Sequence, residues 1–185
     1  YTYKFLWAPL MDSYRPGFLG RRRGWLVLTQ FGLLITIAAI GTLEPRDSLW
    51  LLGAIALTVA FLSASQDIVF DAYRAEVLDR ADRDAGVTVS VLGYRIAMIV
   101  SGGLALIIAD NWLGWHATYW LMAAFMLVGV AAAWSAPEPA SASESPASLI
   151  SAVRDPIREL LDRPAVLALV VLIVLYKLGD VFAAS

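Results

Sequence analysis

The sequence Ser63-Ala64-Ser65-Gln66-Asp67-Ile68-Val69-Phe70-Asp71 closes a long apolar run that begins at Leu49. At about 1.5 Å per residue, a helix from Leu49 to about Tyr73 is long enough to cross a hydrocarbon core of about 30 Å, so Asp67 is expected inside the membrane. A charge near the bilayer centre costs roughly 2.5–3.5 kcal/mol on insertion scales, and such residues usually face a water-filled cavity, a proton relay or a partner charge. Asp67 is therefore the first candidate for a functional residue.

The composition predicts an all-α, polytopic membrane protein. The 185 residues are 59% hydrophobic and 16% charged, with a mean hydropathy of +0.69. A net charge of -2 argues against a nucleic-acid partner, and the absence of cysteine together with a single histidine, His116, excludes disulfides and clustered histidine or thiolate metal sites. We expect no metal and no other cofactor. The chain lacks an initial Met and stops within an apolar run, so we expect a piece of a longer protein.

The apolar stretches divide the chain into three parts. Residues 1–136 are expected to form a transmembrane bundle, residues 137–163 a central cytoplasmic loop with amphipathic surface helices, and residues 164–185 the start of a second bundle. The segments expected in the membrane are residues 1–11, as the second half of a span, then the spans 24–43, 49–73, 86–109, 117–136 and the one beginning at residue 164.

Basic residues alternate between loops and so predict the orientation. The first, third and fifth loops hold most of the arginines, whereas the second loop holds only Arg46 and the fourth holds none. By the positive-inside rule the basic loops are cytoplasmic. Asp67 then lies about 10 Å above the cytoplasmic end of its helix, and Lys4 and Arg95 lie at a similar depth, so these three charges could share one layer of the membrane.

Several of these charges also have a purely structural interpretation. Asp67 could be a paired structural carboxylate, and Asp71 is more simply a pairing partner for Arg74 than a transport residue. Structural ion pairing and substrate contact remain equally open for Lys4 and Arg95.

Three further features have two interpretations each. Lys177 and Asp180, three residues apart, could neutralise each other on one helix. The run Arg21 to Arg23 is mainly a solvated topology signal with a possible second role in gating. Gly102 and Gly103 are expected to allow close helix packing.

Six motifs spread along the chain carry a resemblance to one family: Tyr3–Asp12, Gly20–Trp25, Ser63–Asp71, Ser90–Arg95, Ser101–Gly103 and Leu175–Asp180. Together they resemble the AmpG family of muropeptide permeases, which belongs to the major facilitator superfamily. The resemblance implies a partial major facilitator bundle that runs from the second half of span two to span seven. It places the chain in the inner membrane of a Gram-negative bacterium, as a multi-pass protein.

The resemblance also implies a function, which is proton-coupled import of anhydromuropeptides during cell-wall recycling. The expected partners are the muropeptide, protons and the lipid bilayer, and the protein is expected to be a monomer. A facilitator for another solute, such as a sugar or drug, is the alternative, and a membrane enzyme or a structural subunit is less consistent with the sequence. Asp67 is the expected proton-coupling residue. The expected substrate-binding residues or charge partners are Lys4, Gln66, Asp71, Tyr94, Arg95, Lys177 and Asp180, and the loop or gating residues are Asp12, Arg21, Arg22 and Arg23.

Overall fold

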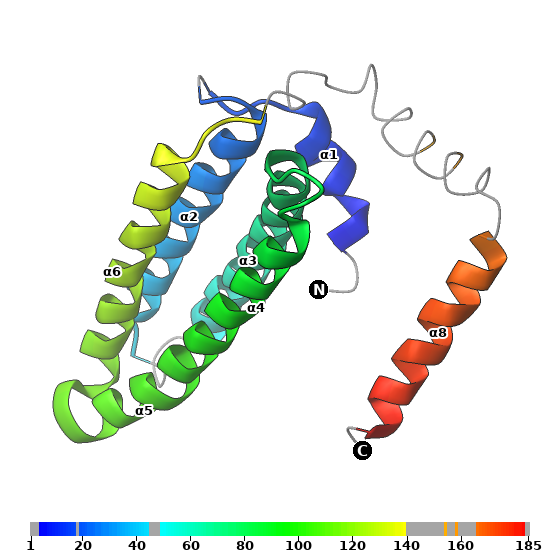
Figure 1. The fold of residues 1–185 in the computed structure, drawn as a ribbon. Coiled ribbons are helices and arrows are strands. Elements are labelled where there is room, and N and C mark those ends of the chain that lie inside the picture. Colours follow the sequence, from blue (N-terminus) through cyan, green and yellow to red (C-terminus); the bar gives the residue numbers. More distant parts are fainter. Residues whose placement is uncertain are drawn as a thin grey trace. The chain divides into compact units, whose positions relative to one another are not determined.

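All the regular elements of the described residues are helical, as the composition predicted (Figure 1). The structure is a computed structural model that describes residues 4–17, 19–44, 49–139, 154, 158 and 166–183. The chain divides into two units, Tyr1–Ser145 and Pro146–Ser185, and each is described by itself. The predicted surface helices at 137–163 lie almost entirely outside the described residues and stay a prediction.

The N-terminal segment differs from the half-span predicted for residues 1–11. A 3-10 turn, η1 (Lys4–Leu6), is followed at Trp7 by a short helix, α1 (Ala8–Ser13). Pro9 lies in the first turn of α1, where its missing N–H costs nothing because the first helical donors lack partners anyway. The helix expected over residues 1–11 is therefore interrupted at Trp7.

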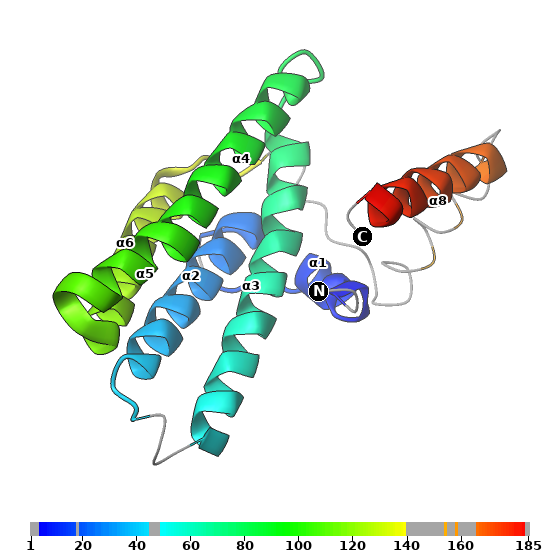
Figure 2. The ribbon, with the colours of Figure 1, turned by 90° about the horizontal axis from the view of Figure 1, so that it is seen from below.

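The helix α2 (Arg21–Ile40) forms the centre of the first unit. It packs against α3 (Leu49–Val77) along one side and against α6 (Gly114–Ser135) along another, as Figures 1 and 2 show. α2 has the predicted length but begins and ends three residues earlier than predicted, whereas α3 is longer than predicted. α2 begins at Arg21, so the arginine run is helical, and α3 continues past Tyr73 to Val77, so Glu76 belongs to the helix and not to the following loop.

A helical hairpin follows α3. The outgoing arm consists of α4 (Arg83–Met98), the π-helical turn η2 (Ile99–Leu104), α5 (Ala105–Ile108) and a second π-helical turn, η3 (Ala109–Leu113). The chain reverses at Gly114, whose φ of 71° is the left-handed conformation that glycine adopts without steric cost. The return arm, α6, then runs back beside α2 (Figure 1). The predicted loop at 110–116 is thus mostly helical, with a single sharp break.

The predicted multi-pass membrane architecture agrees with the lengths and hydropathies of these helices. Among the described residues, three helical stretches are long and apolar enough to cross a membrane: Arg21–Ile40, Leu49–Val77 and Arg83–Ser135. The third contains the reversal at Gly114 and therefore supplies two antiparallel arms. In the second unit, α8 (Val166–Ala183) is also apolar, as the sequence predicted for the last span.

Packing is concentrated where α1, α2, α3 and α6 meet. A cluster of buried side chains joins these helices, and Trp7 packs against it. By contrast α4 has no buried residue. The close packing expected at Gly102 and Gly103 is wrong for this structure, because a Cβ built at either position has no described atom within 4 Å. The cluster consists of Met11, Leu26, Val27, Val69 and Ala133.

Candidate functional site

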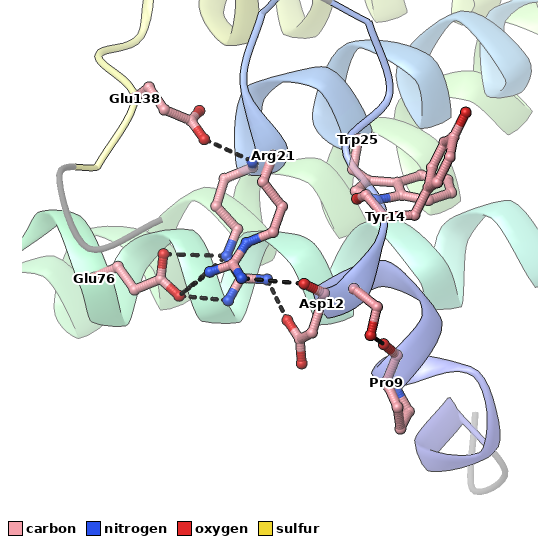
Figure 3. A network of polar contacts seen from close by, with 9 residues as sticks. Pro9, Asp12, Tyr14, Arg21, Trp25, Glu76 and Glu138 are labelled. Carbon is pink, nitrogen blue, oxygen red and sulfur yellow. Dashed lines mark hydrogen bonds and ion pairs between the residues drawn. The ribbon is translucent and has the colours of Figure 1, made fainter. Parts of the chain in front are cut away.

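An ion-pair network joins α1 and the start of α2 to the last turn of α3. The Arg22 guanidinium lies 2.6 Å from Asp12 Oδ1 through Nη1, and its Nε donates to both Glu76 carboxylate oxygens at 3.1 Å. Arg21 donates to the Asp12 carbonyl oxygen at 3.1 Å and lies 3.6 Å from Glu76 Oε1 (Figure 3). Three segments, α1, α2 and α3, are therefore linked by charge-assisted bonds, the stronger kind of hydrogen bond.

The two arginines at the centre of this network are buried. Arg21 and Arg22 are each 5% exposed. The expectation that the arginine run is mainly solvated is therefore wrong for these two residues. Their burial is tolerated because the carboxylates of Asp12 and Glu76 accept their hydrogen bonds and offset their charges.

Glu138, beyond the end of α6, caps the start of α2. Its two carboxylate oxygens accept from the backbone N–H groups of Arg22 and Arg23, at 2.9 and 3.0 Å. The helix begins after Gly20, which offers no side-chain acceptor, so Glu138 satisfies donors that would otherwise lack partners. Gly20 has a φ of 93°, which residues other than glycine rarely adopt, and a Cβ there would lie 2.5 Å from Glu138 Cδ, so a substitution would also displace the capping carboxylate.

Two more contacts attach the end of α6 to this part of the bundle. The Tyr73 hydroxyl donates to the Pro137 carbonyl oxygen at 3.0 Å, and the Arg23 guanidinium donates to the Trp134 carbonyl oxygen. All three predicted arginines and Asp12 therefore lie in one network. Figure 3 shows the part of it around Asp12, Arg21, Glu76 and Glu138. Sequence reasoning did not identify Glu76 or Glu138. The run of three arginines was an available signal, since buried cations require acidic partners.

Asp67 lies in the middle of a second, looser site on α3. Its side chain is exposed, and it makes no hydrogen bond or ion pair with any described residue. Asp71 follows Asp67 by one turn on the same face of α3. Lys4 Nζ lies 4.0 Å from Asp71 Oδ2, and Arg74 Nη2 lies 3.2 Å from Asp71 Oδ1, so the pairing of Asp71 with Arg74 suggested by the sequence is present.

The face of α3 behind Asp67 is packed against the N-terminal segment. Ser65 is completely buried and accepts a hydrogen bond from the Trp7 indole at 3.1 Å, while the rings of Trp7 and Phe61 lie 5.1 Å apart. Gln66, which was predicted as a site residue, has a buried Oε1 that accepts no hydrogen bond from the described residues. Trp7 and Ser65 were part of the quoted motifs, but no role was predicted for either.

The remaining predicted residues are not brought to Asp67. Tyr94 and Arg95 are exposed on α4, and within the described part of the chain Arg95 forms no ion pair. Of the three charges expected to share a layer, Lys4 is paired with Asp71, one turn beyond Asp67 on α3, whereas Arg95 is exposed on α4. Lys177 and Asp180 belong to α8, and their side chains lie outside the described residues, so their roles stay predictions.

Long apolar helices, folded into antiparallel arms with a buried arginine network at one end, define a multi-pass helical membrane protein. A family model described as the Major Facilitator Superfamily matches residues 3–183, so the chain belongs to that superfamily, as predicted. The chain is 54% identical over all of its 185 residues to an anhydromuropeptide permease of Escherichia coli (strain K12), of which it covers 38%.

Two other relatives are more distant. The chain is 39% identical over 190 residues to an uncharacterized protein of Haemophilus influenzae (strain ATCC 51907 / DSM 11121 / KW20 / Rd), covering 44% of it. It is 29% identical over 189 residues to a putative transporter AmpG 4 of Rickettsia felis (strain ATCC VR-1525 / URRWXCal2), covering 46% of that protein and with 97% of this chain aligned. The chain thus spans less than half the length of the curated relatives it matches.

Proposed function

We propose that this chain is part of a proton-coupled secondary transporter that imports anhydromuropeptides across the bacterial inner membrane. The observation that carries the proposal is the 54% identity, over the whole chain, to the anhydromuropeptide permease of E. coli. Membership of the Major Facilitator Superfamily and the long apolar helices support a transporter rather than an enzyme.

Asp67 is the proposed proton-coupling residue. Its carboxylate points away from the packed side of α3 and has no hydrogen-bonding partner among the described residues, so it can gain or lose a proton without breaking a local contact. Protonation removes a charge from a low-dielectric region and so changes the relative free energies of the two transport conformations. Lys4, whose Nζ lies 4.0 Å from Asp71 Oδ2 one turn further along α3, supplies a cation to this site that could also attract a carboxylate of the substrate.

The arginine network is the proposed cytoplasmic gate. Positive-inside orientation assigns the arginine-rich end of α2 to the cytoplasm. There Arg22 links Asp12, near the C-terminal end of α1, to Glu76 in the last turn of α3. Because ion pairs of this kind exist only when their segments are in contact, they favour one arrangement of these segments over the other. Alternating access requires such a difference between the two states.

Uptake by the full-length protein in proteoliposomes tests this function. With an imposed inward proton gradient, we expect labelled anhydromuropeptide to accumulate inside, and a protonophore to abolish the accumulation. Excess unlabelled muropeptide should compete, whereas a monosaccharide or a hydrophobic drug should not. Accumulation that persists after the gradient is collapsed would contradict proton coupling, and gradient-driven uptake of a sugar or drug in place of the muropeptide would show a facilitator for another solute.

A further inference from the structure

The N-terminal segment contacts α3 on both sides of Asp67. Before Asp67 in the sequence, the Trp7 indole Nε1 donates to Ser65 Oγ at 3.1 Å. After it, Lys4 Nζ lies 4.0 Å from Asp71 Oδ2. Residues 4 to 7 therefore span the stretch of helix that holds the proposed proton-coupling carboxylate, with Ser65 buried and the Lys4–Asp71 pair partly exposed.

Trp7 is the joint of this segment. η1 ends at Leu6 and α1 begins at Ala8, and the Trp7 carbonyl oxygen accepts from the backbone N–H groups of Leu10 and Met11 at 3.1 and 3.4 Å. The backbone of Trp7 thus completes the first turn of α1, while its side chain is attached to another helix. If η1 moves relative to α3, the backbone or the side chain of Trp7 must therefore change its conformation or its contacts.

Two successive turns of α3 hold the Trp7 ring. Phe61, one turn before Ser65, packs against the ring at a centroid distance of 5.1 Å and an interplanar angle of 40°. Ser65 is 0% exposed, so its hydroxyl has no access to water as an alternative partner. The Phe61 contact is nonspecific and tolerates small shifts, whereas the hydrogen bond requires the indole N–H to be at one place and direction.

The position of Lys4 depends on Trp7, because Lys4 belongs to η1, the short turn that ends directly before Trp7. The charged groups around Asp67 among the described residues are Lys4 from the N-terminal segment and Asp71 from α3 itself, and Asp71 is also paired with Arg74. Among the described residues, Lys4 is the cation that reaches this part of α3 from a different element, so it can approach or withdraw as the segments move.

We propose that Trp7 is a positioning residue for proton coupling: its hydrogen bond with Ser65 keeps Lys4 beside Asp67, and release of this bond lets the cation withdraw. This inference rests on the proposed function. It adds a structural change that would alter the proton affinity of Asp67 between the two transport conformations. A cation nearby favours the charged carboxylate, and its withdrawal favours proton binding. Movement of η1 against α3 would thereby couple conformation to protonation.

Trp7→Phe and Ser65→Ala each remove this hydrogen bond while retaining most of the packed volume. In the full-length protein in proteoliposomes, we expect each variant to raise the pH at which gradient-driven muropeptide uptake is half-maximal by about one unit, because Lys4 no longer opposes protonation of Asp67. The double variant should show the same shift as either single variant, since both remove one bond. Muropeptide exchange without a gradient should keep the parent's rate at its optimum.

Two controls match these changes. Trp25→Phe removes another indole hydrogen bond, to the Tyr14 carbonyl oxygen at 2.9 Å, and Thr58→Ala removes a hydroxyl of α3 that bonds within its own helix. Both should leave the half-maximal pH of uptake unchanged. Lys4→Gln should reproduce the upward shift, and adding Trp7→Phe to it should shift the half-maximal pH no further.

Three results would overturn the inference: an unshifted half-maximal pH in Ser65→Ala, additive shifts in the double variant, or a further shift when Trp7→Phe is added to Lys4→Gln. Failure of the proposed function has a different signature. If Asp67→Asn accumulates muropeptide as the parent does, Asp67 is not the proton-coupling residue at all. If Asp67→Asn is inactive and Ser65→Ala is unshifted, only the role of Trp7 is wrong.

Discussion

Two carboxylates of the same helix, Glu76 and Asp67, have opposite surroundings. Glu76 accepts hydrogen bonds from Arg22 and lies 3.6 Å from Arg21, and both arginines are buried. Asp67 is exposed and makes no hydrogen bond or ion pair with any residue that the structure describes. The comparison teaches that one end of α3 holds a charge fixed by its partners, while the middle holds a charge that is free to be neutralised.

The energetic consequences differ accordingly. Removing one partner of a buried ion pair leaves an uncompensated charge and costs about 3–5 kcal/mol. Neutralising an exposed carboxylate breaks no contact of that kind, so it affects the equilibrium between conformations more than folding. Variants at the two sites should therefore separate into those that lose coupling and those that lose stability.

The largest effect is expected at the free carboxylate. Asp67→Asn mimics the protonated form at nearly constant volume, so the full-length protein should fold and insert normally but lose gradient-driven uptake completely. Exchange of muropeptide across the membrane should continue, because exchange does not require net proton movement. The measurement is accumulation in proteoliposomes with and without an imposed proton gradient, beside counterflow exchange in the same vesicles.

Asp79→Asn is the matched control for this change, since Asp79 is an exposed acid in the turn between α3 and α4. It should leave uptake unchanged. If Asp67→Asn accumulated substrate against its gradient with the parent's pH dependence, the comparison between the two carboxylates would fail. Asp71 or Asp180 would then be the next candidate for the proton-coupling residue.

A large effect of the other kind is expected at Arg22. Arg22→Ala leaves Asp12 and Glu76 without their shortest ion pairs, but both carboxylates are partly exposed and Glu76 keeps Arg21 nearby, so the free energy of unfolding should fall by about 2–3 kcal/mol. Denaturant titration in detergent micelles measures this fall. Arg80→Ala, at an exposed position in the turn after α3, should change the free energy of unfolding by less than about 0.5 kcal/mol. Equal effects of the two variants would show that the network adds no stability.

Much of the fold could be predicted from the sequence because hydropathy alone determines which segments can cross a membrane. The apolar stretches at 24–43, 49–73, 86–109 and 117–136 each correspond to a helix or a helical arm. Their ends were less predictable. Charged residues at 74–76 suggested a loop, yet α3 continues through them, because Arg22 and Arg21 compensate the charge of Glu76.

The tertiary partners of the site could not be predicted, because they depend on which helix faces lie together. Glu138 and Arg22 are separated by more than one hundred residues, and no local pattern indicates that one caps the helix of the other. The glycines at 102 and 103 show the reverse error: a small-residue pattern suggested close packing, but it lies on an arm that leads away from α3 (Figure 2). A small residue allows another helix to approach closely, but it does not determine whether a helix lies there.

The smallest effect should come from Glu138, which supports the arginine-rich start of α2 through backbone hydrogen bonds and not through ion pairs. It accepts two backbone hydrogen bonds at the start of α2, and loss of a capping acceptor costs about 0.5–2 kcal/mol. Glu138→Ala should therefore lower the free energy of unfolding by about 1 kcal/mol, less than Arg22→Ala does. Glu138→Gln keeps one acceptor but loses the charge that favours a helix N-terminus, so its effect should lie between Glu138→Ala and the parent.

Uptake provides the second measurement for Glu138, because a cap that only stabilises the start of α2 should not alter coupling. Both Glu138 variants should keep the parent's pH dependence of uptake, unlike Trp7→Phe. Asp79→Ala controls for the loss of an acidic side chain at an exposed position. If Glu138→Ala unfolded at the same denaturant concentration as the parent, the hydrogen bonds of Glu138 to the start of α2 would add no stability. A shifted pH dependence would show that the arginine end of α3 and the Asp67 region are coupled, contrary to the division between them.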